Sequence, residues 1–210
     1  KIGSGAAAFS PNGPNTSGVY AMDMVEDELW VARGDRSETW INVYNKAEAY
    51  KFSNETWSSA TGAVGGIPAL DTIYDFVSVS IDPGNKEHVF LGSLGAGIIE
   101  LNNGFLSKLW NETNSSLQSR GDAPFHWVGI FGMDHDESGN LWVTNSYAAN
   151  PLSVRKTDGT WQSFNFSGLV TTPAISQIIA TKSNQKWMAL PGGGILVFNE
   201  NGTWAVNDDS

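Results

Sequence analysis

An internal repeat constrains the fold of this chain more than any other feature of its sequence. A short apolar run with an aromatic residue at its centre occurs four times, and consecutive aromatic positions lie 60, 52 and 45 residues apart. The runs are Leu29-Trp30-Val31, Val89-Phe90-Leu91, Leu141-Trp142-Val143 and Lys186-Trp187-Met188. A period of this size indicates a supersecondary unit that repeats along the chain. We refer to Trp30, Phe90, Trp142 and Trp187 as the anchors.

Each anchor lies in the same local context. In the third repeat an apolar run, 128–133, and a polar turn, 134–140, precede the anchor, and the turn Asp158-Gly159 and Trp161 follow it. Asn-Gly and Asp-Gly between alternating apolar runs are strong hairpin signals, because both central residues need positive φ. Four short strands per repeat are typical of a β-propeller blade. A β-sandwich with chance similarity is the alternative, which four concordant pairs of anchor and turn disfavour.

We therefore predict an all-β fold, a single β-propeller domain over residues 1–210 built from four-stranded antiparallel blades. The blades are expected at about 17–59, 71–109, 125–166 and 174–206, with the four anchors buried between them. The fourth repeat has its own last strand, expected at Thr203 to Val206, and the N-terminal segment is rich in Gly and Ala. Because most propellers have more than four blades, we expect these blades to be part of a larger propeller, or two such chains to pair.

Composition argues against several classes of function. The chain has 12 basic and 22 acidic side chains and a net charge of −10, so nucleic acid is not an expected partner. No apolar run approaches the roughly 18 residues of a membrane span, so we expect no membrane insertion of this segment. The chain has no cysteine, which excludes disulfides, thiolate nucleophiles and thiolate metal sites.

No local catalytic or metal-binding pattern is present. The histidines His88, His126 and His135 form no pair with the spacing of metal ligands. The acidic turn 134–139 resembles half of a calcium loop but lacks the distal glutamate of an EF-hand, so we interpret it as a hairpin turn. We predict no catalytic residue, no metal and no cofactor. A pair of carboxylates brought together in space for glycoside hydrolysis stays open.

The long connection of the first repeat is the candidate binding element. Residues 33–48 separate two expected strands, and loops longer than the usual few residues are often functional. We expect this connection and the start of the third repeat to share one face, where aromatic rings stack on sugars or apolar groups and arginines supply fixed donors. A decorated but inert loop is the alternative. The candidate ligand-binding residues are Arg33, Arg36, Trp40, Tyr44, His126, Trp127 and Tyr147.

The unit Gly139-Asn140-Leu141-Trp142-Val143, with an Asp-rich turn before it and an Asp-Gly turn and Trp after it, resembles the two-component-regulator propeller repeat. That repeat is common in surface and periplasmic proteins of bacteria, especially Bacteroidetes. The segment 9–14, followed by Leu29-Trp30-Val31, is similar to the start of the propellers in PorZ-like proteins of the Por (type IX) secretion system. The second repeat departs from the pattern with Phe90 in place of Trp, and the fourth with Lys186 in place of Leu.

The resemblance implies a non-catalytic β-propeller module for ligand or protein binding. It would serve as an extracytoplasmic sensor domain or as a surface or secretion scaffold, in the periplasm, at the outer membrane or secreted. The implied partners are a protein or glycan ligand, and further propeller blades or a second copy of the chain. A propeller-fold lyase or hydrolase acting on a carbohydrate or lactone is the alternative. A purely structural spacer is a third possibility.

Overall fold

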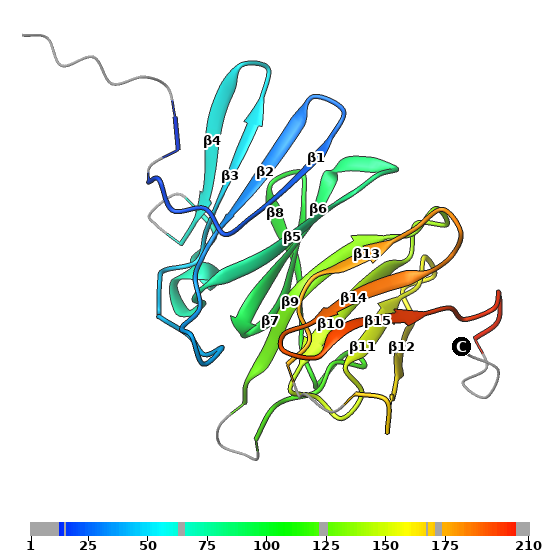
Figure 1. Ribbon diagram of the computed structural model, residues 1–210. Coiled ribbons are helices and arrows are strands. Elements are labelled where there is room, and N and C mark those ends of the chain that lie inside the picture. The colour runs from blue at the N-terminus through cyan, green and yellow to red at the C-terminus, as the bar shows by residue number, and fades with distance from the viewer. Residues whose placement is uncertain are drawn as a thin grey trace, which may run out of the picture.

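The computed structural model describes residues 13–14, 16–62, 66–121, 126–166, 168–170 and 174–204 (Figure 1). Within these ranges fifteen strands follow one another, and the one helical element is the short 3-10 helix η1, Pro68–Thr72. The prediction of an all-β fold is confirmed. The strands fall into four consecutive groups, which we call units 1 to 4.

In each unit, strands that are consecutive in the chain pair antiparallel, so every unit is a meander. Unit 1 contains β1 (Ala21–Val25), β2 (Glu28–Arg33), β3 (Glu48–Ser53) and β4 (Thr56–Thr61), and unit 2 contains β5 (Phe76–Asp82), β6 (Asn85–Gly95), β7 (Gly97–Asn102) and β8 (Phe105–Trp110). Unit 3 contains β9 (Val128–His135), β10 (Leu141–Ser146), β11 (Leu152–Arg155) and β12 (Trp161–Phe164), and unit 4 contains β13 (Ile178–Ala180), β14 (Lys186–Leu190) and β15 (Gly194–Phe198).

Turn chemistry explains where the hairpins form. Asn103 and Gly104 join β7 to β8 with φ of 51° and 76°, and Asn201 and Gly202 follow β15 with φ of 52° and 74°. Two successive residues with positive φ match the twist of the flanking strands, and Asn and Gly adopt this conformation at low cost. Gly159, between β11 and β12, also has positive φ.

Two features depart from four separate four-stranded blades. The end of β6 pairs with the start of β9 through Leu94↔Gly129 and Gly95↔Val128, so units 2 and 3 share one eight-stranded sheet. Unit 4 has three strands in the described part of the chain. The expected last strand, Thr203 to Val206, is absent at Thr203 and Trp204, and its remaining positions lie outside the described residues.

Apolar clusters hold consecutive units together. One cluster joins units 1 and 2, a second joins units 2 and 3, and a third joins units 3 and 4. The units therefore follow one another around an arc, with β1, β5, β9 and β13 innermost (Figure 1). Among the described residues no apolar cluster connects unit 4 back to unit 1.

Three anchors are buried as predicted, and the fourth is not. Trp30, Phe90 and Trp142 expose 4%, 1% and 0% of their surface, whereas Trp187 exposes 42%. The prediction for Trp187 is wrong because the outer face of unit 4 has no further unit packed on it in the described part of the chain. Ile179 and Val197, which flank Trp187 in the sheet, are exposed with it.

Trp142 is the best-supported anchor. It stacks on Phe164 at 5.7 Å between ring centroids, and its indole Nε1 donates to Asp136 Oδ2 at 2.8 Å. Asp136 also accepts the backbone N–H groups of Ser138 and Asn140, so the acidic turn is organised by its own donors. Lys186, fully buried, lies above the ring with its Nζ 4.2 Å from the centroid. This contact explains why a lysine occupies the leucine position of the fourth repeat.

The junction between units 2 and 3 contains two histidines whose pKa values are shifted in opposite directions. Desolvation by burial lowers the pKa of His135 to about 4, and its Nδ1 hydrogen-bonds with Ser80 Oγ at 2.9 Å. His88 lies between Glu100 and Asp82, and the hydrogen bond with Glu100 is the main cause that raises its pKa. His135 is therefore neutral in the folded state at pH values where a histidine in the unfolded chain is already protonated.

Replacing Trp142 with alanine should lower the free energy of unfolding by about 3–5 kcal/mol, because it empties a fully buried volume and removes one of the donors to the Asp136 carboxylate. The matched control is Trp187→Ala, which should cost less than about 1 kcal/mol because that ring is already half in solvent. Urea unfolding followed by circular dichroism measures both. Equal losses for the two variants would contradict the arrangement of the units.

Lowering the pH from 6.5 to 4 should destabilise the protein through His135. In this window the unfolded chain binds a proton at this site and the folded chain does not, so stability falls as pH falls, by roughly 1–3 kcal/mol. His88 acts oppositely, since its raised pKa gives stability that is lost as pH rises through its folded pKa. Comparing urea midpoints of the wild type and His135→Gln across this range isolates the first effect. A variant with an unchanged pH slope would count against it.

Candidate functional site

The two ends of the units form two different faces. One face carries the short hairpin turns, such as β1–β2 and β3–β4 at the top of Figure 1. The opposite face carries the long connections: 34–47 between β2 and β3, and the described residues of the connections between β4 and β5 (62 and 66–75) and between β8 and β9 (111–121 and 126–127). We call this second face the connection face. Most of the residues expected to bind a ligand lie on it.

An open cleft of about 710 Å³ occupies the connection face where units 1, 2 and 3 meet. Its lining includes Asn42 and Tyr44 from unit 1, Tyr74 before β5, and His126 and Trp127 before β9. Tyr44 is 70% exposed and meets Tyr74 edge to face at 5.6 Å. The cleft therefore offers aromatic walls and amide and hydroxyl groups rather than a concentrated charge.

Asp75 fixes the shape of the unit 1 connection. Its buried carboxylate accepts four hydrogen bonds, from Asn42 Nδ2 and from the backbone N–H groups of Val43, Tyr44 and Asn45, at 2.8 to 3.1 Å. Hydrogen bonds to an ionised group are the strong ones. One side chain thus holds four consecutive residues of a loop that lies some thirty positions earlier in the chain.

Trp127 is held in place from two sides. Its indole Nε1 donates to Asn42 Oδ1 at 2.8 Å, a contact between residues 85 positions apart. A Cβ at Gly129 would lie 2.3 Å from the Trp127 ring, so only glycine fits beneath it. Trp127 and Trp40 both pack against the small buried cluster of Val77, Leu94 and Phe131.

These contacts place three partly exposed aromatic rings on the connection face, which we call the platform: Trp40, Trp127 and Tyr147. Phe131 is buried and supports Trp40 from within. Trp40 contacts Phe131 at 5.0 Å, and Trp127 contacts Tyr147 at 5.9 Å. Trp40, Tyr44 and Tyr147 all have left-handed backbone, with φ of 62°, 64° and 62°. Bulky residues rarely adopt this conformation, and residues that do so cluster at ligand sites.

Arginines lie at both ends of the platform. The Arg36 guanidinium stacks 3.7 Å from the Trp40 ring centroid, and Arg120 lies 4.2 Å from the centroid of Tyr147 and 5.7 Å from that of Trp127. Arg36 also donates from Nε to the Tyr20 hydroxyl at 3.1 Å. Stacking holds the planes of the two cations and leaves donors along their edges.

The candidates divide into three groups. Arg36, Trp40, Trp127 and Tyr147 form or border the platform, while Tyr44 and His126 line the cleft beside Trp127. His126 Nδ1 lies 2.6 Å from Glu112 Oε1. Arg33 is separate: it ends β2 and pairs with Glu48 on β3 at 3.0 Å.

Sequence reasoning missed Asn42, Asp75, Glu112 and Arg120. Asn42 lies inside the long connection that was singled out, so its position was a usable signal. Asp75 and Glu112 have no local feature that distinguishes them, since their partners come from distant segments. Arg120 belongs to a polar connection between expected blades, and its partners Trp127 and Tyr147 could not be paired with it from sequence.

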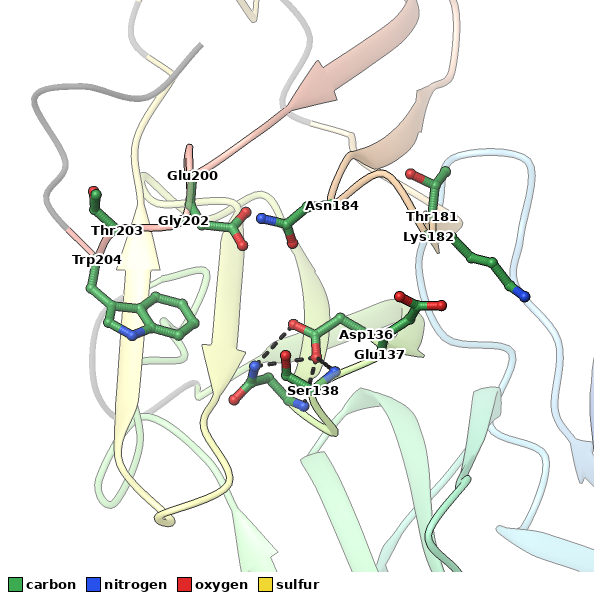
Figure 2. A pocket seen from close by; sticks show the side chains of 11 residues that line it. Asp136, Glu137, Ser138, Thr181, Lys182, Asn184, Glu200, Gly202, Thr203 and Trp204 are labelled. Atoms are coloured by element: carbon green, nitrogen blue, oxygen red, sulfur yellow. Dashed lines mark hydrogen bonds between the residues drawn. The ribbon is translucent and has the colours of Figure 1, made fainter.

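A smaller pocket of about 300 Å³ lies on the hairpin-turn face between units 3 and 4 (Figure 2). Asp136 at its base is bonded to its own turn and to the Trp142 indole, and Glu200 pairs with buried Lys186. Trp204 closes one side and stacks over Trp142. The polar groups of this pocket therefore stabilise the junction of two units. In the described ranges no group of three or more His, Asp or Glu side chains could hold a metal ion.

Comparisons with known proteins identify the fold. No protein-family model and no curated protein matches the sequence. PorZ of Porphyromonas gingivalis, an essential bacterial surface component of the type-IX secretion system, matches 97% of this chain with a TM-score of 0.79 and 19% identity. The extracellular domain of the hybrid two-component system BT3049 from B. thetaiotaomicron matches 91% at 0.61 and 13%, and the WD40 repeats of RRP9 match 90% at 0.51 and 10%.

These likenesses show a partial β-propeller. The chain spans 28% of the PorZ chain, 24% of the BT3049 domain and 53% of the RRP9 chain. At such identities they carry the fold and not the activity. No helix in the described part of the chain is both long and apolar enough to cross a membrane.

Replacing Asp75 with alanine should release the unit 1 connection, because four donors lose one shared acceptor. We expect a loss of at least about 2 kcal/mol in the free energy of unfolding and faster hydrogen exchange at the amides of residues 43–45. Asp71→Ala is the control, since Asp71 is exposed and pairs with Lys46 at 3.4 Å, a contact worth less than about 1 kcal/mol. Unchanged exchange at 43–45 in Asp75→Ala would disprove the role of the carboxylate.

Proposed function

We propose that this chain is a non-catalytic β-propeller module that binds a glycan or protein ligand on its connection face. It acts outside the cytoplasm, in the periplasm, at the outer membrane or secreted, as a sensor domain or as a scaffold for surface or secretion machinery. The observation that carries the proposal is the platform beside the cleft: aromatic side chains from units 1 and 3 are fixed side by side by Asp75, Asn42 and Gly129.

Physical reasoning supports binding at this face. Positioning an aromatic ring in advance reduces the ordering cost of association, and ring faces suit both sugars and apolar side chains. Left-handed backbone at Trp40, Tyr44 and Tyr147 costs conformational energy, and folding alone gives no reason for bulky residues to adopt it. The likeness to PorZ and to a sensor extracellular domain supports the location outside the cytoplasm and both proposed roles.

Further propeller units, or a second copy of the chain, complete the ring in this proposal. The exposed side chains Ile179, Trp187, Ile195 and Val197 form an apolar face on unit 4, and Met22 and Met24 are exposed on β1 of unit 1. Apolar faces of this kind are usually covered by a partner. The chain aligns with about a quarter of two longer propeller proteins, which favours additional units.

One observation favours a second candidate, a propeller-fold lyase or hydrolase acting on a carbohydrate or lactone. His126 and Glu112 lie within hydrogen-bond distance at the cleft, and a histidine oriented by a carboxylate is a common general base. In the described part of the chain no group of three or more acidic or histidine side chains could hold a metal beside this pair, and binding is therefore the first candidate.

Binding should depend on Trp127. In a panel of glycans analysed by calorimetry, Trp127→Ala should weaken any ligand of the wild type at least tenfold, because the ring supplies the central stacking surface of the platform. Trp187→Ala, which removes an exposed tryptophan on another surface, should bind as the wild type does. Product analysis of the same samples tests the second candidate, since turnover lost in His126→Gln would favour an enzyme. Ligands bound equally by all three variants would refute the proposed site.

A further inference from the structure

We infer that the platform selects a saccharide that carries a carboxylate, with Arg120 and Arg36 as the groups that recognise the charge. The inference rests on the proposed function, because it names the ligand class of the same face. It follows from the state of the two arginines and from the rings on which they lie.

Arg120 carries a charge without a counterion among the described residues. Its side chain is exposed, and its guanidinium contacts the rings of Tyr147 and Trp127 without a hydrogen bond or ion pair to a described group. The arginines outside this face are neutralised: Arg33 pairs with Glu48 at 3.0 Å, and Arg155 approaches Glu100 at 3.5 Å.

Arg36 repeats this arrangement at the other end of the platform. Its guanidinium stacks on Trp40, donates to the Tyr20 hydroxyl and to the Ser37 carbonyl, and pairs with no carboxylate among the described residues. Guanidinium groups have five N–H donors, so neutral partners that take two of them leave the rest for a ligand. Both cations thus lie over aromatic rings and keep N–H donors that no described carboxylate accepts.

The described acids of the connection face form no ion pair with these arginines. Asp75 is buried and occupied by four donors, and Glu112 is paired with His126. Asp35 and Glu38 are exposed in the unit 1 connection, and Asp35 accepts the backbone N–H of Arg36. The molecule carries a net charge of −10, so an acidic ligand binds only where local cations overcome the general repulsion.

A carboxylate-bearing sugar matches both parts of the platform. A guanidinium edge binds a carboxylate through two parallel hydrogen bonds, and a pyranose ring presents C–H groups that pack on an aromatic face. An acidic peptide would pair with the arginines but does not need the aromatic rings of the platform. A neutral sugar would pack on the aromatic rings but would leave both guanidinium groups without a carboxylate partner.

The test compares trigalacturonic acid with its fully methyl-esterified form, which keeps the rings and removes the charge. Calorimetry on the wild type at low salt should show at least tenfold tighter binding of the acid. Arg120→Gln should remove most of this preference while binding the ester as the wild type does. Arg33→Gln is the matched control and should keep the preference. Near-ultraviolet circular dichroism verifies that the variants are folded.

Each outcome separates the inference from the proposed function. Equal binding of acid and ester by the wild type would overturn the inference and leave the binding module intact. A tri-glutamate peptide that binds as well as the acidic sugar would show that the site reads charge alone, which also overturns it. Binding of neither saccharide overturns the inference, whereas the proposed function fails only if the whole glycan and protein panel is negative.

Discussion

A polar side chain on the innermost strand couples each unit to the next, and the arc depends on this contact together with the anchor opposite to it. Asp23 Oδ2 accepts the backbone N–H of Ile81 in β5 at 2.7 Å, and Asp134 Oδ2 accepts a backbone N–H of β13 at 2.8 Å. Ser80 hydrogen-bonds with His135 of β9 at 2.9 Å. Each of these three residues lies directly opposite an anchor in its hairpin. Apolar packing holds the units together, and the partly buried polar contact fixes their register, since a hydrogen bond requires a narrow range of geometries.

Unit 4 breaks this rule. Ile179 occupies the position opposite Trp187 and cannot accept a hydrogen bond from a following strand. Isoleucine and the anchor are exposed together, and Ile195 and Val197 extend the same apolar surface. A unit that packs there would do so by apolar contact alone, without the polar contact that sets the register at the three internal junctions. The last face of the arc therefore differs in chemistry from the junctions that the chain makes with itself, and it is the surface where association is least constrained.

The repeat made the fold predictable because its signals are local. The spacing of the anchors and the Asn-Gly and Asp-Gly turns act within one hairpin, so they could be read without knowing what packs on it. Burial of Trp187 could not be read in this way, because it depends on the next unit and not on its own hairpin. The same limit separates the candidate residues. Arg33 belongs by sequence to the long connection, yet it ends β2 and faces Glu48 across the sheet, while Asn42 meets Trp127 across 85 positions.

The connections between strands supply the rings of the proposed binding face, whereas the repeated anchors do not contribute to it. Three aromatic residues of this face have left-handed backbone, and one of them, Tyr44, is held by the Asp75 carboxylate, which accepts four hydrogen bonds from residues 42–45. Strands can keep their register while such loops change freely, because the anchors and turns that define a unit lie elsewhere in it. Similarity to PorZ at 19% identity therefore supports the same arrangement of units in this chain, but it does not identify the ligand. Relatives that share a ligand with this chain should share Asp75, Asn42 and the glycine beneath Trp127, whatever their anchors are.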